Sequence, residues 1–371
     1  MEGIFKNDKC TLKMSNVKVR ESNIELLRNI SMFMILIIHA NFVSLPRIEY
    51  EELMANTVPS ITRFFFESLG IVAVNVFVFI SGWFGIRPRT KSVLSFIYQI
   101  LFFLLGGGIL FILIGKATFS VDWLLDAFQL SNKDWFIKSY LVLMIIAPIL
   151  NAYTNNAEEK TQRYVMIAFF LFEAIFGWVL GGRRFFVEGY GPLHFIGLYI
   201  TAQYIHNQIG LETTPVFLKR LFQMPKWADI IVFFLTVILN TSLVFLGSEY
   251  FHNVRPFFRV AYAYSNPLVI IGALYLLLFF SKMDLPYVKI INWLGASSFA
   301  VYLFHGEATI RSEFFTPQVQ WLYDNFSGIG CVGMIFMFLC LVYIASVLVD
   351  QLRLLSWNGL WSLHEKKITK K

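Results

Sequence analysis

The sequence predicts an all-α integral membrane protein, a bundle of about ten transmembrane helices with both termini in the cytoplasm. Of its 371 residues, 57% are hydrophobic and only 15% are charged, and the mean hydropathy is +0.62. An ordinary soluble domain carries roughly a quarter charged residues, so a water-soluble fold could not cover this much apolar surface. The 40 Phe and nine Trp agree, because lipid-facing surfaces and interfacial belts are rich in aromatic side chains.

Apolar runs of roughly 17 to 25 residues, the length that crosses about 30 Å of hydrocarbon, set the expected spans. Two runs are irregular. The run at 190–206 is short and contains His194, and the run at 290–306 is interrupted by Gly295, Ser297 and Ser298. The ten expected spans lie near 24–45, 66–86, 93–115, 135–152, 164–182, 190–206, 228–247, 260–280, 290–306 and 328–352.

The distribution of basic residues predicts the orientation of these spans. With the N-terminus inside, about two thirds of the 31 Lys and Arg fall in cytoplasmic segments, as positively charged loops favour that side. Residues 1–23 are then a cytoplasmic N-terminal segment, 24–352 the transmembrane domain and 353–371 a basic cytoplasmic tail. The net charge of +7 gives no reason to expect nucleic acid, because the basic residues sit between apolar runs.

Two ionisable residues of the first run share a helix face. His39 lies eleven positions after Arg28, which is three helical turns plus about 20°, or about 16 Å along the axis. Glu25 lies on the same stripe, one turn before Arg28. Ionisable groups inside a bilayer are costly and often mark sites, and His has the pKa that a general base needs. The alternatives are a hydrogen bond between helices for His39 and a snorkelling side chain for Arg28.

The Arg28-(ten residues)-His39 spacing resembles the signature of the acyltransferase-3 family, bacterial membrane enzymes that O-acetylate lipopolysaccharide, capsule and other surface glycans. The resemblance extends from about residue 20 to 350. Four further segments resemble family motifs in order: Asn75 to Gly85 with Ser81-Gly82; Asp134-Trp135-Phe136 with Tyr140 and Pro148; Gly191 to Ala202; and Leu294 to His305. His194 departs from the usual pattern, and the sequence assigns it no role.

The resemblance implies an O-acyltransferase of the bacterial inner membrane that uses acetyl-CoA, or another acyl-CoA, as co-substrate, without a permanently bound cofactor or metal. The expected partners are membrane lipids, acyl-CoA and a surface glycan or lipid-linked glycan acceptor. His39 is the expected base, and Arg28 holds donor phosphates or the catalytic geometry. The cofactor-binding candidates are Arg87, Arg89 and Lys91, because coenzyme A carries phosphates that favour Arg and Lys. The alternative for these three residues is that they only reflect the excess of basic residues in cytoplasmic loops.

The remaining candidates are substrate-binding residues. By family analogy they are Asn75, Ser81, Asp134 and Trp135, although Ser81-Gly82 also fits close helix packing and Trp135 an interfacial anchor. The pair His305 and Glu307 is expected near the outer side, where it orients the acceptor or caps a helix end.

Two other classes of function remain open at this point. A transporter or flippase of lipid-linked sugars also has many spans with buried charge, but such proteins often show two similar halves with interrupted helices, and no such pairing is visible. A membrane scaffold for glycan assembly would make His39 dispensable.

Overall fold

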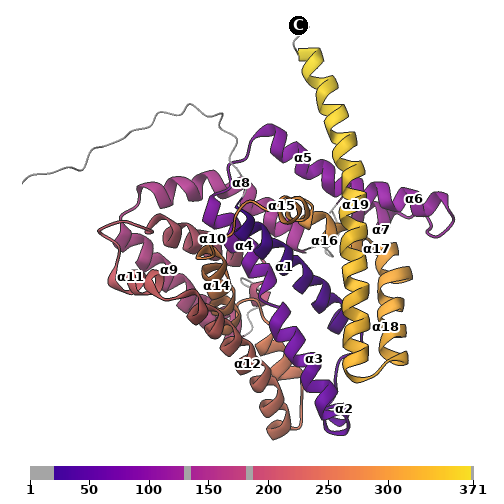
Figure 1. The fold of residues 1–371 in the computed structure, drawn as a ribbon, viewed down its shortest axis with the longest axis horizontal. Coiled ribbons are helices and arrows are strands. Elements are labelled where there is room, and N and C mark those ends of the chain that lie inside the picture. Colours follow the sequence, from indigo (N-terminus) through magenta and orange to yellow (C-terminus); the bar gives the residue numbers. More distant parts are fainter. Residues whose placement is uncertain (1–20, 129–134, 181–186, 369–371) are drawn as a thin grey trace, which may run out of the picture.

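The computed structural model describes residues 21–128, 135–180 and 187–368, and within these ranges the chain is helical and has no strand. Long apolar runs alternate with shorter polar segments along the chain, so long helices are joined by brief turns and small helices (Figure 1). The α-helices are α1 Ser22–Ile38, α2 Tyr50–Ala55, α3 Thr57–Gly70, α4 Ala73–Phe84, α5 Thr90–Leu101, α6 Gly107–Leu113, α7 Val121–Ala127, α8 Trp135–Asn156, α9 Glu159–Glu173, α10 Pro192–Asn207, α11 Val216–Gln223, α12 Lys226–Phe251, α13 Arg255–Ala261, α14 Pro267–Ser281, α15 Lys289–Ala296, α16 Ser298–Gly306, α17 Ala308–Ile310, α18 Thr316–Asn325 and α19 Gly328–Ile368.

Four π-helical segments and one 3₁₀ turn extend or join these helices. The first π-helical segment continues α1 directly and begins at His39. Such wide turns occur mostly as local features and are frequent at functional sites. The π-helical segments are His39–Val43, Phe102–Gly106, Ala174–Val179 and Arg311–Phe315, and the 3₁₀ turn is Val187–Gly189.

Seven helical stretches of the described residues are long and apolar enough to cross a membrane. The chain is therefore a multi-pass membrane protein. The stretches are Ser22–Val43, Thr57–Phe84, Thr90–Leu113, Trp135–Asn156, Glu159–Val179, Lys226–Phe251 and Gly328–Lys366.

Three of the ten expected spans are not among these seven, so the count of ten is not confirmed. The runs at 190–206 and 260–280 form α10 and α14, which have only 16 and 15 residues. The run at 290–306 breaks at Ser297 into α15 and α16. Near that break the Glu25 carboxylate lies against Gly295, where a Cβ would meet Glu25 Oε2.

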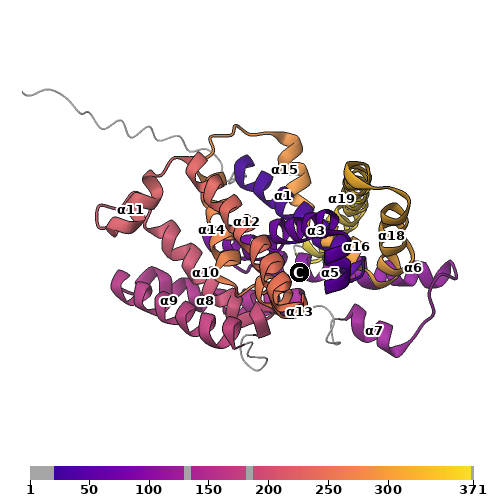
Figure 2. The same cartoon turned by 90° about the horizontal axis from the view of Figure 1, so that it is seen from below.

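α1 lies at the centre of the bundle. Helices α3, α4, α15 and α16 pack against it. In the views of Figure 1 and Figure 2, α8 and α9 form an outer layer on one side, and α18 and α19 lie on the other. Most apolar side chains of α1 are accordingly buried, with Leu27 and Leu36 fully inaccessible.

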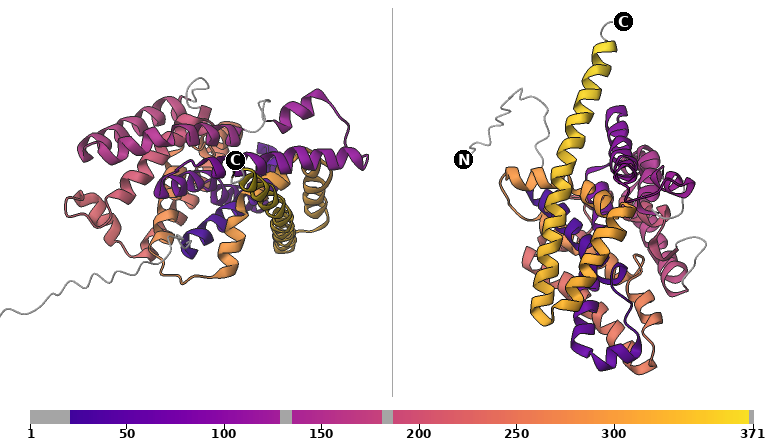
Figure 3. Two further views of the ribbon diagram at one scale, coloured as in Figure 1. Left: turned by 90° about the horizontal axis from the view of Figure 1, so that it is seen from above. Right: turned by 90° about the vertical axis from the view of Figure 1, so that its right-hand side faces the viewer.

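The last helix continues past the expected end of its span. At 41 residues α19 is about 60 Å long, twice the thickness of the hydrocarbon layer. Its C-terminal part projects beyond the rest of the bundle (Figure 3). Residues 353–368, expected in a basic tail, are thus helical.

Candidate functional site

A cavity of about 360 Å³ opens between α1, α4, α5, α8, α15 and α16. It is the size of a small ligand pocket. Four of the candidate site residues line it, and they come from α1 with its π-helical continuation, α4 and α8: Arg28, His39, Ser81 and Trp135. The arginine and the histidine come from the same face of α1, as the spacing predicts, so the cavity runs along about three turns of that helix.

His39 is joined to His305 at the end of the cavity away from Arg28. His39 Nδ1 lies 2.7 Å from His305 Nε2, and the two rings are tilted with centroids 4.9 Å apart. His305 Nδ1 in turn contacts the carbonyl oxygen of Val301, one turn earlier on α16. The two histidines are 266 residues apart in the sequence.

This chain of contacts fixes the tautomers of both rings when they are neutral. A carbonyl oxygen only accepts hydrogen bonds, so His305 Nδ1 carries the proton and donates it to Val301. His305 Nε2 is then an acceptor, and His39 Nδ1 must donate to it. His39 Nε2 is left without a proton and has no hydrogen-bond partner among the described residues. A basic nitrogen is therefore available beside the cavity.

Arg28 lies at the other end, in an ion pair with Glu25. Its Nη1 is 2.9 Å from Glu25 Oε1, and 26% of the side chain is exposed while the glutamate is nearly inaccessible. The pair holds the guanidinium in place, but the remaining N–H groups of Arg28 are still able to bind an anion.

The wall between these two ends is aromatic. The Trp135 ring packs against Tyr264, with centroids 5.2 Å apart, and against Phe195 at 5.9 Å. Ser81 Oγ donates to Phe77 O at 2.9 Å and lies 3.2 Å from the Tyr140 hydroxyl. Trp135 and Ser81 thus belong to the cavity wall inside the bundle, which gives them a role in shaping the pocket.

The basic residues expected at the donor site flank the cavity. Ile86 and Ser92 line it, and Arg87, Arg89 and Lys91 between them are all exposed. Lys91 Nζ lies 5.0 Å from the centre of the Trp361 ring on α19. The three cations are therefore at the rim of the cavity and not in it.

Three other candidates lie elsewhere. Glu307 caps α17, because its carboxylate accepts from the backbone N–H groups of Thr309 and Ile310, both at 2.9 Å. Asn75 is fully buried behind the wall, where Nδ2 donates to Tyr264 O at 2.9 Å. Asp134 lies outside the described residues.

His194, which had no assigned role, is fully buried between Glu173 and Asn75. Its Nδ1 is 2.8 Å from Glu173 Oε1 and its Nε2 is 2.9 Å from Asn75 Oδ1. Asn75 Nδ2 must face the Tyr264 carbonyl, so Oδ1 faces His194, and Nε2 donates to it. One proton lies between Nδ1 and Glu173. Both ring nitrogens are therefore occupied in every allowed arrangement.

Sequence reasoning gave no site role to several polar residues of the cavity, among them Gln99 and Tyr302. A signal existed for Tyr302, because the i, i+3 spacing to His305 places both on one helix face. Gln99 is a lone amide in an apolar run, and only the packing of α5 against α19 reveals it. Within 21–128, 135–180 and 187–368 no group of three or more His, Cys, Asp or Glu could hold a metal ion.

The comparison with protein families gives one finding. Residues 21–350 match the model of the acyltransferase-3 family, described as an acyltransferase domain. The match contains the cavity, His39, which lines it, and His305, which binds His39. No curated protein and no solved structure gives a match.

Proposed function

The chain belongs to the acyltransferase-3 family, and from this premise we propose that it is a membrane O-acetyltransferase of the bacterial inner membrane. Acetyl-CoA is the donor, and the acceptor is a hydroxyl of a cell-envelope polysaccharide such as capsule or lipopolysaccharide. The observation that carries the proposal is the contact of His39 Nδ1 with His305, which leaves Nε2 as the free nitrogen, on a residue that lines a cavity also reaching Arg28.

The proposed reaction uses His39 Nε2 as the general base. It takes the proton of the acceptor hydroxyl as that oxygen attacks the thioester carbonyl carbon. When the tetrahedral intermediate collapses, the C–S bond breaks and the thiolate of coenzyme A takes the proton from His39. The products are the acetyl ester and free coenzyme A, and the histidine returns to its starting form. A positioned base of this kind contributes about 10²- to 10⁴-fold.

His305 is a positioning residue in this scheme. Its Nε2 accepts from His39 Nδ1, which holds the ring in the tautomer with a free Nε2. The same hydrogen bond stabilises the imidazolium that forms while His39 carries the proton, because hydrogen bonds to charged groups are stronger than neutral ones.

In this proposal the basic residues bind the acyl donor through its phosphates. Coenzyme A has a diphosphate and a 3′-phosphate, and the free N–H groups of Arg28 are suited to one of them. The exposed residues Arg87, Arg89 and Lys91 suit the phosphates that remain at the rim. The thioester then extends along α1 towards His39, about 16 Å from Arg28.

The test is group transfer by the purified protein in lipid nanodiscs. The acceptor is surface polysaccharide of the source cells after mild alkaline removal of its esters, with acetyl-CoA as donor. We expect release of the coenzyme A thiol and a matching gain of acetyl ester by mass spectrometry, both lost in His39→Ala. His364→Ala, a change at an exposed histidine of α19, is the matched control and keeps both signals. Absence of thiol release and ester from the wild type would contradict the proposal.

A further inference from the structure

Gln99 is a polar side chain that the proposed reaction does not yet use. It lies on α5, lines the cavity and is only 9% exposed. A buried amide in an apolar helix is costly unless its polar atoms have partners. Its contacts therefore indicate what it is there to bind.

A buried ion pair of α19 fixes the orientation of this amide. Gln99 Nε2 is 3.3 Å from Asp350 Oδ1, and a carboxylate only accepts hydrogen bonds. The amino group must consequently point at Asp350, and the carbonyl oxygen must point away from it. The carbonyl oxygen has no hydrogen-bond partner among the residues that the structure describes.

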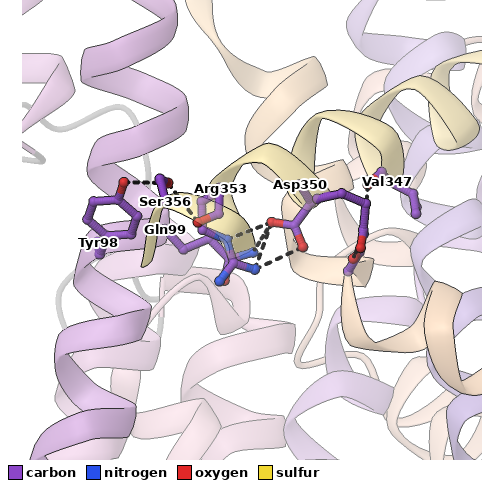
Figure 4. A network of polar contacts seen from close by, with 8 residues as sticks. Tyr98, Gln99, Val347, Asp350, Arg353 and Ser356 are labelled. Carbon is purple, nitrogen blue, oxygen red and sulfur yellow. Dashed lines mark hydrogen bonds and ion pairs between the residues drawn. The ribbon is translucent and has the colours of Figure 1, made fainter. Parts of the chain in front are cut away.

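The carboxylate itself is held rigidly. Arg353 Nε donates to Asp350 Oδ1 and Arg353 Nη2 to Oδ2, both at 2.8 Å, and both residues are almost inaccessible, with exposed fractions of 0% and 4%. Figure 4 shows this pair reaching from α19 towards Gln99 on α5. A forked pair of this kind has one preferred geometry, so the amide that binds to it is presented in one direction.

The position of Gln99 along the length of the cavity follows from Gln351, the residue that follows Asp350 on α19. Gln351 donates to Ser297 Oγ at 3.4 Å, and Ser298 lines the cavity. On one side, Ser298 comes shortly after Gly295, which lies against Glu25, the ion-pair partner of Arg28. On the other side, Ser298 comes two helical turns before His305, which binds His39. Gln99 is thus placed between the anion-binding end of the cavity and the basic nitrogen.

We propose that Gln99 binds the pantetheine arm of the acyl donor, with its side-chain carbonyl accepting a hydrogen bond from an amide N–H of that arm. The inference rests on the proposed function, because it names a contact for the same donor. The arm is the part of coenzyme A that joins the phosphates to the thioester, and it carries two amide N–H donors. A fixed carbonyl between Arg28 and His39 matches that chemistry.

The test compares two ligands in the full-length protein in nanodiscs, coenzyme A and adenosine 3′,5′-bisphosphate, which lacks the arm. Gln99→Met keeps the size of the side chain and removes the carbonyl. We expect it to weaken the binding of coenzyme A roughly 3- to 10-fold, as for one lost hydrogen bond, and to leave the binding of the bisphosphate unchanged. Tyr98→Phe is the matched control, since it removes a 2.7 Å hydrogen bond from Tyr98 to Ser356 on the same pair of helices and keeps both affinities.

Every other outcome contradicts either the contact of Gln99 with the arm or the proposed function. Equal affinity of wild type and Gln99→Met for coenzyme A, or equal weakening of both ligands, overturns the contact with the arm and leaves the proposed function standing. Failure of the wild type to bind coenzyme A overturns the proposed function together with this inference. Because the ligand ratio is measured within one variant, a smaller folded fraction of Gln99→Met does not change the result.

Discussion

His39 and His194 are both imidazoles inside the helical bundle, but their surroundings leave them different atoms to use. His39 has one nitrogen bound to His305 and the other beside a cavity. His194 has both nitrogens bound, to Glu173 and to Asn75, and is fully buried. The comparison teaches that an ionisable residue within a membrane domain is a catalytic candidate only if it keeps a lone pair and an opening towards a ligand.

The largest effect is expected at His39. In His39→Gln the amide nitrogen still donates to His305, so the fold is kept, but no group can accept the substrate proton. We expect kcat to fall about 10²- to 10⁴-fold, measured as thiol release in nanodiscs, with an unchanged unfolding temperature. Activity above a tenth of the wild-type value would remove His39 from the role of base.

At His194 we expect the opposite pattern, a loss of stability without a loss of chemistry. His194→Ala leaves the Glu173 carboxyl buried without its partner, and breaking such a pair typically costs about 3–5 kcal/mol. The free energy of unfolding in detergent should fall by that amount, whereas the activity per folded molecule stays the same. The double variant Glu173→Met, His194→Leu should recover most of the loss, because it removes both buried polar groups together. A fall in kcat at unchanged stability would make His194 part of the reaction.

A smaller effect is expected at His305, which acts through His39. His305→Phe keeps a ring to pack on Phe315, whose centroid lies 5.5 Å away, but removes the acceptor for His39 Nδ1. Losing a hydrogen bond to a charged group costs about 1.5–3 kcal/mol, which corresponds to roughly a 10- to 150-fold lower kcat. His305→Gln, whose carbonyl is able to accept the same proton, should retain more activity than His305→Phe. Equal rates for the two variants would show that the hydrogen bond is irrelevant.

The smallest effect is expected at an exposed ion pair, which contrasts with the buried pair of Glu173 and His194. Arg255 Nη2 lies 2.9 Å from Glu49 Oε1 on the surface, and the hydrogen bond from Arg255 lowers the pKa of Glu49 below its ordinary value of 4.5. Any stabilisation is therefore complete above that ordinary value and is lost as the pH falls through the lower pKa of the folded protein. Because exposed pairs contribute little, Glu49→Gln should leave the unfolding temperature unchanged at pH 7. A clear decrease in the unfolding temperature at pH 7 would mean that the ion pair of Glu49 and Arg255 stabilises the bundle.

Part of the candidate site follows from local sequence. The spacing of Arg28 and His39 predicts a shared helix face, and both line the cavity. The motifs of three other runs supplied Ser81, Trp135 and His305, which lie in the wall or bind to His39. The shared face of Arg28 and His39 is readable from the sequence because a helix has a fixed period, so the separation of two residues gives the relative direction of their side chains.

Other predictions remained open where the outcome depends on neighbouring helices. The count of ten spans is not confirmed, since hydropathy measures apolar length and does not show where α15 and α16 separate around Glu25 and Gly295. Asn75 is tied to His194 and Glu307 caps α17, although sequence could not distinguish these contacts from substrate binding.

The sequence by itself determined the membrane class, most of the long helices and the family, because composition, hydrophobic length and short motifs are properties of neighbouring residues. Only the tertiary structure decided which imidazole has a free nitrogen and which polar groups face the cavity. Those outcomes depend on hydrogen bonds between residues far apart in the chain, such as His39 with His305 and Gln99 with Asp350. The role of a buried polar atom depends on its hydrogen-bond partner, and the packing of whole helices determines which partner it has.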